Sequence, residues 1–433
     1  MTSNASTPPI DKIPPEILSK IFVLCLPSSP EPPLLSKAPL LLGTVCSRWR
    51  AIALATPALW ATLKLRDTSR AANSILTTWL LRAGAVPLDY DLTATSAGGG
   101  RHLLLQPLIA LHARWRDVSF TFSVDAYASF QSVCGCSFPV LRRLSLCIMS
   151  AVTDSHMRSF GEVPPLDLLD APLLQELKVV PLTSKHLRAP WAQLTRLEII
   201  GETLADDLSL LRQCPALIHL ILHNYGRNAP EMPPDPVVLP HLQSIRLASL
   251  ELLSFLILPA LTTWHVNLTV VGFRPHTDGL SALFERWACS LTTLVIAYNT
   301  YCDIGMLKRI LVSAPSVVEL RLDAGLAWST ESTSLGCLAL ALGWPASVPV
   351  LSKLAVFELT LQSAVGAQYT ARCLDGCVIF VEILRRRALS RVRLCLPAMS
   401  ALHTDVAALF CSLRDTPMEV EVVGKNDIDL LTE

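Results

Sequence analysis

Apolar residues recur along this chain at the spacing apolar-x-x-apolar-x-apolar, in which the last two apolar positions alternate with polar ones. The stretches with this spacing begin at Leu141, Leu174, Leu194, Leu217, Leu242, Leu261, Leu291, Val317, Leu354 and Leu389. Because side chains of a strand point alternately to opposite faces, each stretch predicts a short strand with one buried face.

Between several of these stretches the apolar spacing changes to three or four residues, which predicts helices. These segments cover residues 204–211, 280–287, 306–311, 378–384 and 406–413. A helix followed by a short strand has one apolar side that it cannot bury alone, and stacking of such units closes a continuous core. The pattern therefore predicts an α/β fold in which parallel strands line one face and helices cover the other.

The same alternation extends toward both ends of the chain. It predicts strands around Leu63 and Leu65 and over residues 86–92, 115–120 and 420–423. Residues 66–84 are predicted to form a helix that ends at Gly84, with Leu76, Leu80 and Leu81 on its buried side.

Two segments near the start, residues 13–25 and 45–53, predict short amphipathic helices of a different kind. Pro14 and Pro15 suit a first helical turn, where a missing N–H group costs nothing. The apolar residues that follow gather on one face. A proline-rich segment, residues 26–39, separates the two helices.

In order, the chain has Ile-Pro-Pro-Glu-Ile-Leu at 13–18, Ile-Phe at 21–22, Val-Cys-x-x-Trp-Arg-x-Ile-Ala at 45–53 and Pro-x-Leu-Trp at 57–60. This string resembles an F-box over about residues 10 to 60, and the chain is similar to fungal F-box proteins with irregular leucine-rich repeats. It departs from the family at Ile13, where Leu is commoner, and in the segment 26–39, which interrupts the module and places its middle helix in question.

The resemblance implies a helical module that docks on a Skp-type adaptor, and through it on a cullin, as the substrate-receptor subunit of a ubiquitin ligase. It implies adaptor contacts where this sequence matches the family pattern, although some of the same apolar residues must pack the core of the module. These positions are Pro14, Ile17, Leu18, Ile21, Phe22, Val45, Cys46 and Trp49.

The later part of the chain resembles an irregular leucine-rich-repeat solenoid. The spacing between first apolar residues runs from 19 residues (242 to 261) to 37 residues (317 to 354), against about 20 to 29 in regular repeats. Only Asn299 occupies the asparagine position of the consensus. The predicted organisation is a disordered tail over residues 1–9, an F-box over 10–60 and the solenoid over 61–430.

The polar residues that alternate with buried ones project from the strand-lined face. Both signs of charge are present, which suits recognition of a protein target, because complementary charges give specificity. Such residues also face water on an open sheet that binds nothing. The candidate target contacts are Arg143, Lys178, Arg196, Glu198, His219, His223, Arg246, Glu319, Arg321 and Asp323.

Composition excludes several other classes of function. The formal net charge is zero, so the chain lacks the excess of positive charge that nucleic-acid binders use to contact phosphates. The mean hydropathy is +0.44, but prolines interrupt the two most apolar stretches, 252–273 and 332–352, so no membrane span is predicted. Residues 1–12 are polar, so no secretory signal is expected.

Nothing in the sequence predicts catalysis, a cofactor or a metal site. The 13 cysteines include no C-x-x-C pair and favour reduced thiols in the cytoplasm or nucleus. His219 and His223 lie four residues apart but on a predicted strand, without the glutamate of a zinc-protease helix. Two hypotheses besides the substrate receptor stay open: a non-ligase scaffold whose front helices only cap the solenoid, and an enzyme.

Overall fold

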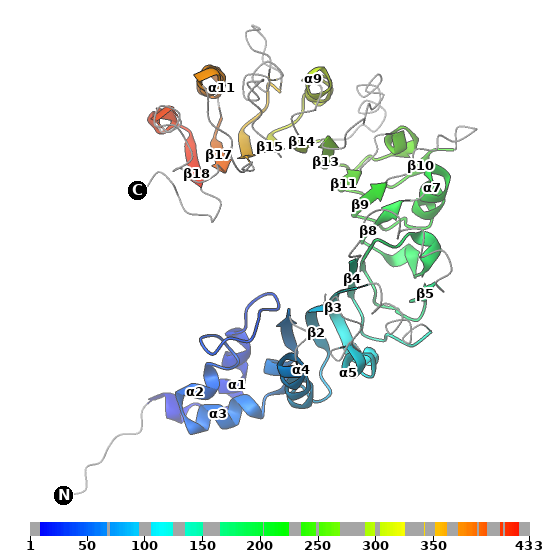
Figure 1. Ribbon diagram of the computed structural model, residues 1–433, viewed down its shortest axis with the longest axis vertical. Helices are drawn as coiled ribbons and strands as arrows, with labels where there is room; N and C mark the ends of the chain where they lie inside the picture. Colours follow the sequence, from blue (N-terminus) through cyan, green and yellow to red (C-terminus); the bar gives the residue numbers. More distant parts are fainter. Residues whose placement is uncertain are drawn as a thin grey trace, which may run out of the picture. The chain divides into compact units, whose positions relative to one another are not determined.

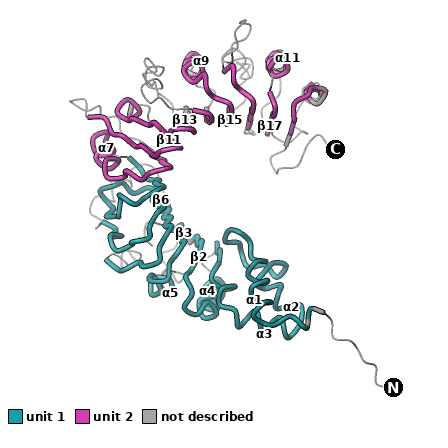
Figure 2. Tube along the Cα trace, turned by 180° about the vertical axis from the view of Figure 1, so that it is seen from behind, with its two compact units in different colours: residues 1–202 teal, residues 203–433 magenta. Residues whose placement is uncertain are grey.

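The computed structural model describes residues 9–66, 70–94, 105–123, 135–149, 165–201, 203–224, 235–247, 251–268, 291–298, 304–324, 342, 351–361, 371–387, 389–395, 408–409 and 412–423. The chain divides into two compact units, residues 1–202 (unit 1) and 203–433 (unit 2), which Figure 2 shows in different colours. Both units combine parallel strands with helices, so the predicted α/β class is confirmed.

Unit 1 contains a parallel sheet in which neighbouring strands follow the chain order (Figure 1). Its strands are β1 (Thr62–Leu65), β2 (Leu88–Ala94), β3 (Trp115–Ser123), β4 (Arg143–Met149), β6 (Glu176–Val180) and β8 (Arg196–Gly201). A separate parallel pair joins β5 (Leu166–Asp167) to β7 (Leu187–Arg188). The helices α4 (Arg70–Arg82) and α5 (Leu105–Ile109) connect the first strands.

Unit 2 repeats this plan, again with each parallel strand beside the next. Its sheet contains β9 (His219–Asn224), β11 (Ser244–Leu247), β13 (Thr263–Leu268), β14 (Thr293–Tyr298), β15 (Glu319–Ala324), β16 (Val356–Leu361), β17 (Arg391–Cys395) and β18 (Glu419–Val423). β10 (Val237–Val238) pairs with β12 (Leu256–Ile257). The helices are α7 (Leu204–Arg212), α9 (Ile304–Ser313) and α11 (Ala371–Arg386), and α9 and α11 lie on one side of the strands (Figure 1).

Short 3₁₀ turns complete the described elements. They are η1 (Pro9–Lys12), η2 (Pro57–Trp60), η3 (His112–Arg114), η6 (Ser184–His186), η7 (Trp191–Gln193), η8 (Glu251–Phe255) and η10 (Ser412–Asp415).

Burial alternates along the strands as the sequence predicts. In β4, Leu144, Leu146 and Ile148 are buried while Arg143 and Met149 are exposed. Each predicted stretch contains a strand at its last two apolar positions, so this prediction is confirmed. The buried faces form the core, which in unit 1 contains the tilted ring pair of Trp115 and Phe120 with centroids 5.1 Å apart.

One predicted burial is wrong. The inward side of α4 consists of Leu76, Trp79, Leu80 and Ala83, whereas Leu81 is 78% exposed. Residues at i, i+3, i+4 and i+7 share one helix face, and position 81 falls outside that series. The helix prediction over 280–287, Asn299 and half of the helix prediction over 406–413 lie outside the described residues.

Three helices form the front module, defined here as residues 9–60: α1 (Pro15–Leu24), α2 (Leu42–Val45) and α3 (Ser47–Leu54). Pro15 occupies the first turn of α1, and the Sγ atom of Cys46 accepts the N–H of Trp49 at the start of α3. Arg48 donates to the backbone carbonyls of Ile10 and Ile13, which ties α3 to the segment before α1.

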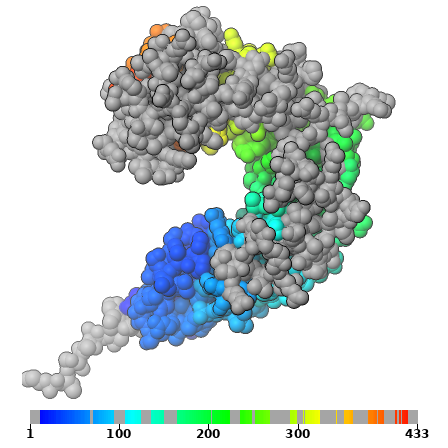
Figure 3. All heavy atoms as spheres, viewed as in Figure 1, coloured from blue at the N-terminus to red at the C-terminus, as the bar shows by residue number. Residues whose placement is uncertain are grey.

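The front module packs on α4 and β1, and the blue atoms of this part of the chain adjoin one another in Figure 3. Trp60 is buried, and its Nε1–H donates to the carbonyl of Ala53 at 2.9 Å. Its ring meets Trp79 of α4 edge-on, with centroids 4.9 Å apart, and the Arg82 guanidinium lies 4.3 Å from the ring centroid. The module therefore belongs to unit 1, and the division of the chain falls within the region predicted as a solenoid.

The proline-rich segment 26–39, here called the strap, lies beside β1. The Lys64 N–H on the outer edge of β1 donates to the Glu31 carbonyl at 3.3 Å, and Lys37 forms an ion pair with Glu31. An uncovered strand edge leaves backbone groups without partners. The strap thus satisfies part of the first edge of the sheet, and α2 still forms after it as a helix of 4 residues.

Candidate protein-binding surfaces

A row of exposed apolar side chains lies along α1. Ile17 is 46% exposed, Ile21 is 41% exposed and Leu24 is 84% exposed. Their spacing of four and three residues puts them on one face of the helix. On α2, Val45 is 55% exposed. These side chains give the front module an apolar surface, and contiguous exposed apolar patches often mark sites of protein–protein interaction.

The opposite face of α1 packs the core of the module. Leu18 is 1% exposed and Phe22 is 0% exposed, and the Phe22 ring lies 4.8 Å from the half-buried Trp49 ring, centroid to centroid. Leu18 and Phe22 are therefore among the predicted contact residues that instead pack the core of the module. Pro14 and Cys46 are exposed, like Ile17, Ile21 and Val45.

A second candidate surface is a groove of about 570 Å³ on the polar face of the unit 1 sheet. Residues from β1, β2, β3, β4, β6 and β8 line it, and strap residues including Leu26, Pro27 and Pro30 form a wall. This volume falls within the range of ligand-binding pockets. Here the strap adds a wall to a sheet face that is otherwise open.

The lining residues follow two rows across the strands. In the first row, register places Thr62, Asp89, Asp117, Arg143, Glu176 and Arg196 side by side on successive strands. In the second row, it places Lys64, Asp91, Ser119, Ser145, Lys178 and Glu198 side by side. All of these except Lys64 line the groove.

The end of the groove near the strap is acidic. Asp89, Asp91 and Asp117 line it, whereas Lys64 and Arg116, the partners of Asp91 and Asp89, do not; Arg143, the main partner of Asp117, also lines the groove. The Arg116 Nε atom donates to Asp89 at 2.9 Å. Burial raises the pKa of Asp89, and Arg116 opposes this shift. The hydrogen bond that Arg116 donates to Asp89 in turn raises the pKa of Arg116.

The other end carries cations. Arg143 makes a bidentate contact with Asp117 at 2.9 and 3.2 Å, and this hydrogen bonding raises the pKa of Arg143. Lys178 pairs with Glu198 at 2.9 Å. Arg196 is exposed, and within the described part of the chain it takes part in no ion pair. The structure thus brings together Arg143, Lys178, Arg196 and Glu198 as predicted.

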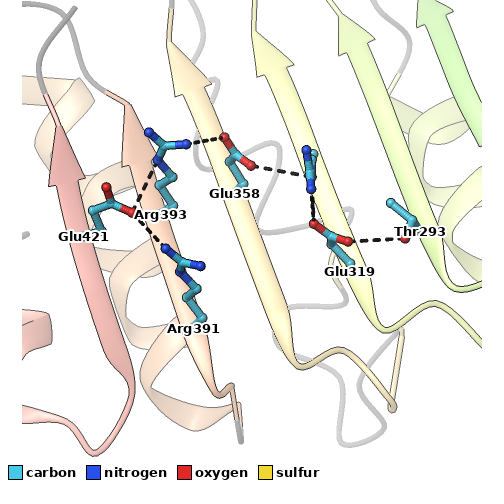
Figure 4. Close-up of polar contacts among 7 residues, drawn as sticks. Thr293, Glu319, Glu358, Arg391, Arg393 and Glu421 are labelled. Carbon is cyan, nitrogen blue, oxygen red and sulfur yellow. Dashed lines mark hydrogen bonds and ion pairs between the residues drawn. The ribbon is translucent and has the colours of Figure 1, made fainter. Parts of the chain in front are cut away.

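The polar face of unit 2 carries a continuous network of ion pairs, which Figure 4 shows. Glu358 lies 3.5 Å from the Nε atom of Arg321 and 3.7 Å from Arg393. Glu421 lies 3.2 Å from Arg391 and 3.4 Å from Arg393. Opposite charges therefore alternate from β15 to β18 and neutralise one another.

The remaining predicted target residues also lie on strands of unit 2. Glu319 binds Arg321 at 2.6 Å and accepts from Thr293. Arg246 lies 3.3 Å from the Nδ1 atom of His265, and burial, with Arg246 and Arg321, lowers the pKa of His265 to about 4. His219, His223 and Asp323 are half-buried on β9 and β15.

Reasoning from the sequence missed the acidic part of the groove. Asp89 and Asp91 are the polar members of the alternation in 86–92, so the pattern that predicted this strand already marked them. Asp117 follows the same logic in β3. The strap wall carried no such signal, because proline content shows that a segment is irregular without showing which strand it covers.

None of the helices among the described residues combines the length and apolar character that crossing a bilayer requires. No group of three or more His, Cys, Asp or Glu side chains in the described ranges is arranged to hold a metal ion.

Comparison with known proteins gives no family assignment. The chain matches no known protein-family profile and no curated protein.

Proposed function

We propose that this chain is the substrate-receptor subunit of a Skp/cullin/F-box ubiquitin ligase. In this proposal the front module binds a Skp-type adaptor, and through it a cullin, while the strand face binds a protein target. The strands and helices then form an irregular leucine-rich-repeat solenoid behind an F-box. In this role the chain performs no chemistry itself. It holds the target beside the ligase, which raises the effective concentration of the target there. Its place of action is the cytoplasm or nucleus.

The observation that carries the proposal is the exposed apolar row of α1. The front module already has a buried core in Leu18, Phe22, Ile52 and Ala53. Ile17 and Ile21 lie outside that fully buried core and stay 46% and 41% exposed as large apolar side chains at the surface. They also stand within the sequence string that resembles an F-box. Adaptor contacts are therefore proposed for Pro14, Ile17, Ile21, Val45 and Cys46, with Trp49 at the edge of the core.

A pull-down with a purified Skp-type adaptor tests this proposal. The double variant Ile17→Asp/Ile21→Asp should lose adaptor binding while keeping its fold, because both side chains are already in contact with water. Leu81→Asp is the matched control, since it makes the same change at an exposed apolar residue on α4. Equal adaptor recovery from wild type and double variant, or no recovery from wild type, contradicts the proposal.

The scaffold hypothesis has its own supporting observation. Trp60 and the strap carbonyl of Glu31 join the front module to α4 and β1, as a cap on the first repeat would. Deleting residues 1–58 would remove Ala53, which accepts the hydrogen bond of the Trp60 ring, and would disturb unit 1 whether the front module is an F-box or only a cap. The deletion therefore does not separate the two hypotheses. The adaptor pull-down with wild type and the Ile17→Asp/Ile21→Asp variant separates them, because a module that only caps the solenoid should bind no adaptor.

A further inference from the structure

The groove of unit 1 is elongated across the strands. Its lining residues occupy the same two register positions from β1 to β8. Strands of a sheet lie about 4.8 Å apart, so the five steps from β1 to β8 span roughly 24 Å. A compact ligand would contact only two or three of these strands. The shape suits an extended chain that lies across them.

Charge differs between the two ends of the groove. Near the strap, Asp89, Asp91 and Asp117 face the groove. Lys64 and Arg116, which pair with Asp91 and Asp89, stay outside its lining, whereas Arg143, which pairs with Asp117, lies within it. At the far end, Arg196 is exposed and has no ion pair among the described residues. An occupant with one cationic and one anionic group would complement this separation.

The middle and the wall of the groove indicate what lies between those groups. Ser119 and Ser145 occupy the second row between the charged strands and offer hydroxyl groups. Leu26, Pro27 and Pro30 of the strap give an apolar wall at the acidic end. Peptide N–H and C=O groups can pair with such hydroxyls, and an apolar side chain can pack on the wall.

We propose that the groove binds an extended peptide segment of the target, with a Lys or Arg at the strap end and an Asp or Glu at Arg196. From β2 to β8 there are four steps, or about 19 Å, and an extended chain rises about 3.3 Å per residue. The two charged residues of the peptide are therefore about six positions apart. The inference deepens the target-binding half of the proposed function and rests on it.

Selection from a phage library of random short peptides on the full chain tests the spacing. The recovered peptides should contain a basic and an acidic residue about six positions apart, with an apolar residue next to the basic one. Synthetic copies labelled with fluorescein then give affinities by anisotropy. Selected peptides without this charge pair, or no selected peptide at all, overturn the inference.

Arg196→Glu sharpens the test. It should weaken the selected peptides by about three- to tenfold, the range expected for an exposed charge contact turned into a repulsion. It should also favour peptides in which the acidic residue is replaced by Lys. Arg142→Glu is the matched control, since Arg142 is exposed beside β4 but does not line the groove. Equal effects of the two variants overturn the inference.

Adaptor pull-down with the same variants separates this inference from the ligase proposal. Arg196→Glu should recover as much adaptor as wild type, because Arg196 is on β8 and not in the front module. Peptide binding without adaptor binding leaves the groove inference standing and removes the ligase proposal. Adaptor binding without any selected peptide leaves the ligase proposal standing and removes the groove inference.

Discussion

The polar faces of the two units share a backbone plan but use their charges differently. In unit 2, Glu358 and Glu421 each bridge two arginines, so the charges satisfy one another along the sheet. In unit 1, Asp89, Asp91, Asp117 and Glu198 are also ion-paired, but the strap adds a wall and Arg196 stays exposed without an ion pair among the described residues. The difference shows that one backbone plan can supply either an open face crossed by a network of ion pairs or a face with a walled groove.

The buried faces should behave alike, because both units bury a similar apolar layer. Phe120→Ala in unit 1 and Phe357→Ala in unit 2 remove fully buried rings. Each should lower the free energy of unfolding of its unit by about 3 to 5 kcal/mol. Native-state hydrogen exchange of strand amides measures this unit by unit. A loss below about 1 kcal/mol for either variant would show that the apolar layer of that unit is not a tightly packed core.

The polar faces should respond unequally to loss of a carboxylate. Glu358→Gln leaves Arg321 and Arg393 without a shared partner, so it should cost unit 2 about 1 kcal/mol, as expected for a partly exposed network. Glu176→Gln in unit 1 is the counterpart, because Glu176 forms no ion pair among the described residues. It should change stability by less than about 0.5 kcal/mol. Similar costs for both variants would remove the contrast.

The smallest effect concerns pH and belongs to unit 2. The pKa of His265 is lowered to about 4 from 6.5, so the unfolded chain binds a proton before the folded one does. Stability should therefore be complete above pH 6.5 and fall as the pH drops toward 4. Solvent screening of this half-buried side chain limits the loss to about 1 kcal/mol or less.

Hydrogen exchange of the β13 amides between pH 6.5 and 4 measures this effect. His265→Gln should remove the loss of stability of β13 between pH 6.5 and 4 that His265 causes. Above pH 6.5, the stability of the variant should stay close to that of wild type. A variant whose pH dependence matches wild type would show that another group is responsible.

Much of the fold follows from apolar spacing alone, because alternation records which face of a strand is buried. Leu144 and Leu146 illustrate this, and so do Leu320 and Leu322. The orientation of α1 did not follow, since its apolar residues cover a broad arc. Only the position of α3 decides that Leu18 and Phe22 point inward while Ile17 and Ile21 point outward.

The groove was predictable in part. The cations Arg143, Lys178 and Arg196 stand at polar positions of recognised repeats, so the sequence marked them. The wall depended on a contact between the strap and β1 through the backbone carbonyl of Glu31. Backbone groups carry no residue-specific signal, which is why the sequence predicted an interruption of the module and not the wall of a groove.

The most direct test of the account is hydrogen exchange of the full chain with and without a purified Skp-type adaptor. We expect protection of the amides of α1 and α2, Pro15–Leu24 and Leu42–Val45, with unchanged exchange across β14 to β18. The Ile17→Asp/Ile21→Asp variant should show no such protection. Unchanged exchange in the front module at saturating adaptor, or protection confined to other elements, would contradict the claim that this module is the adaptor-binding part of the chain.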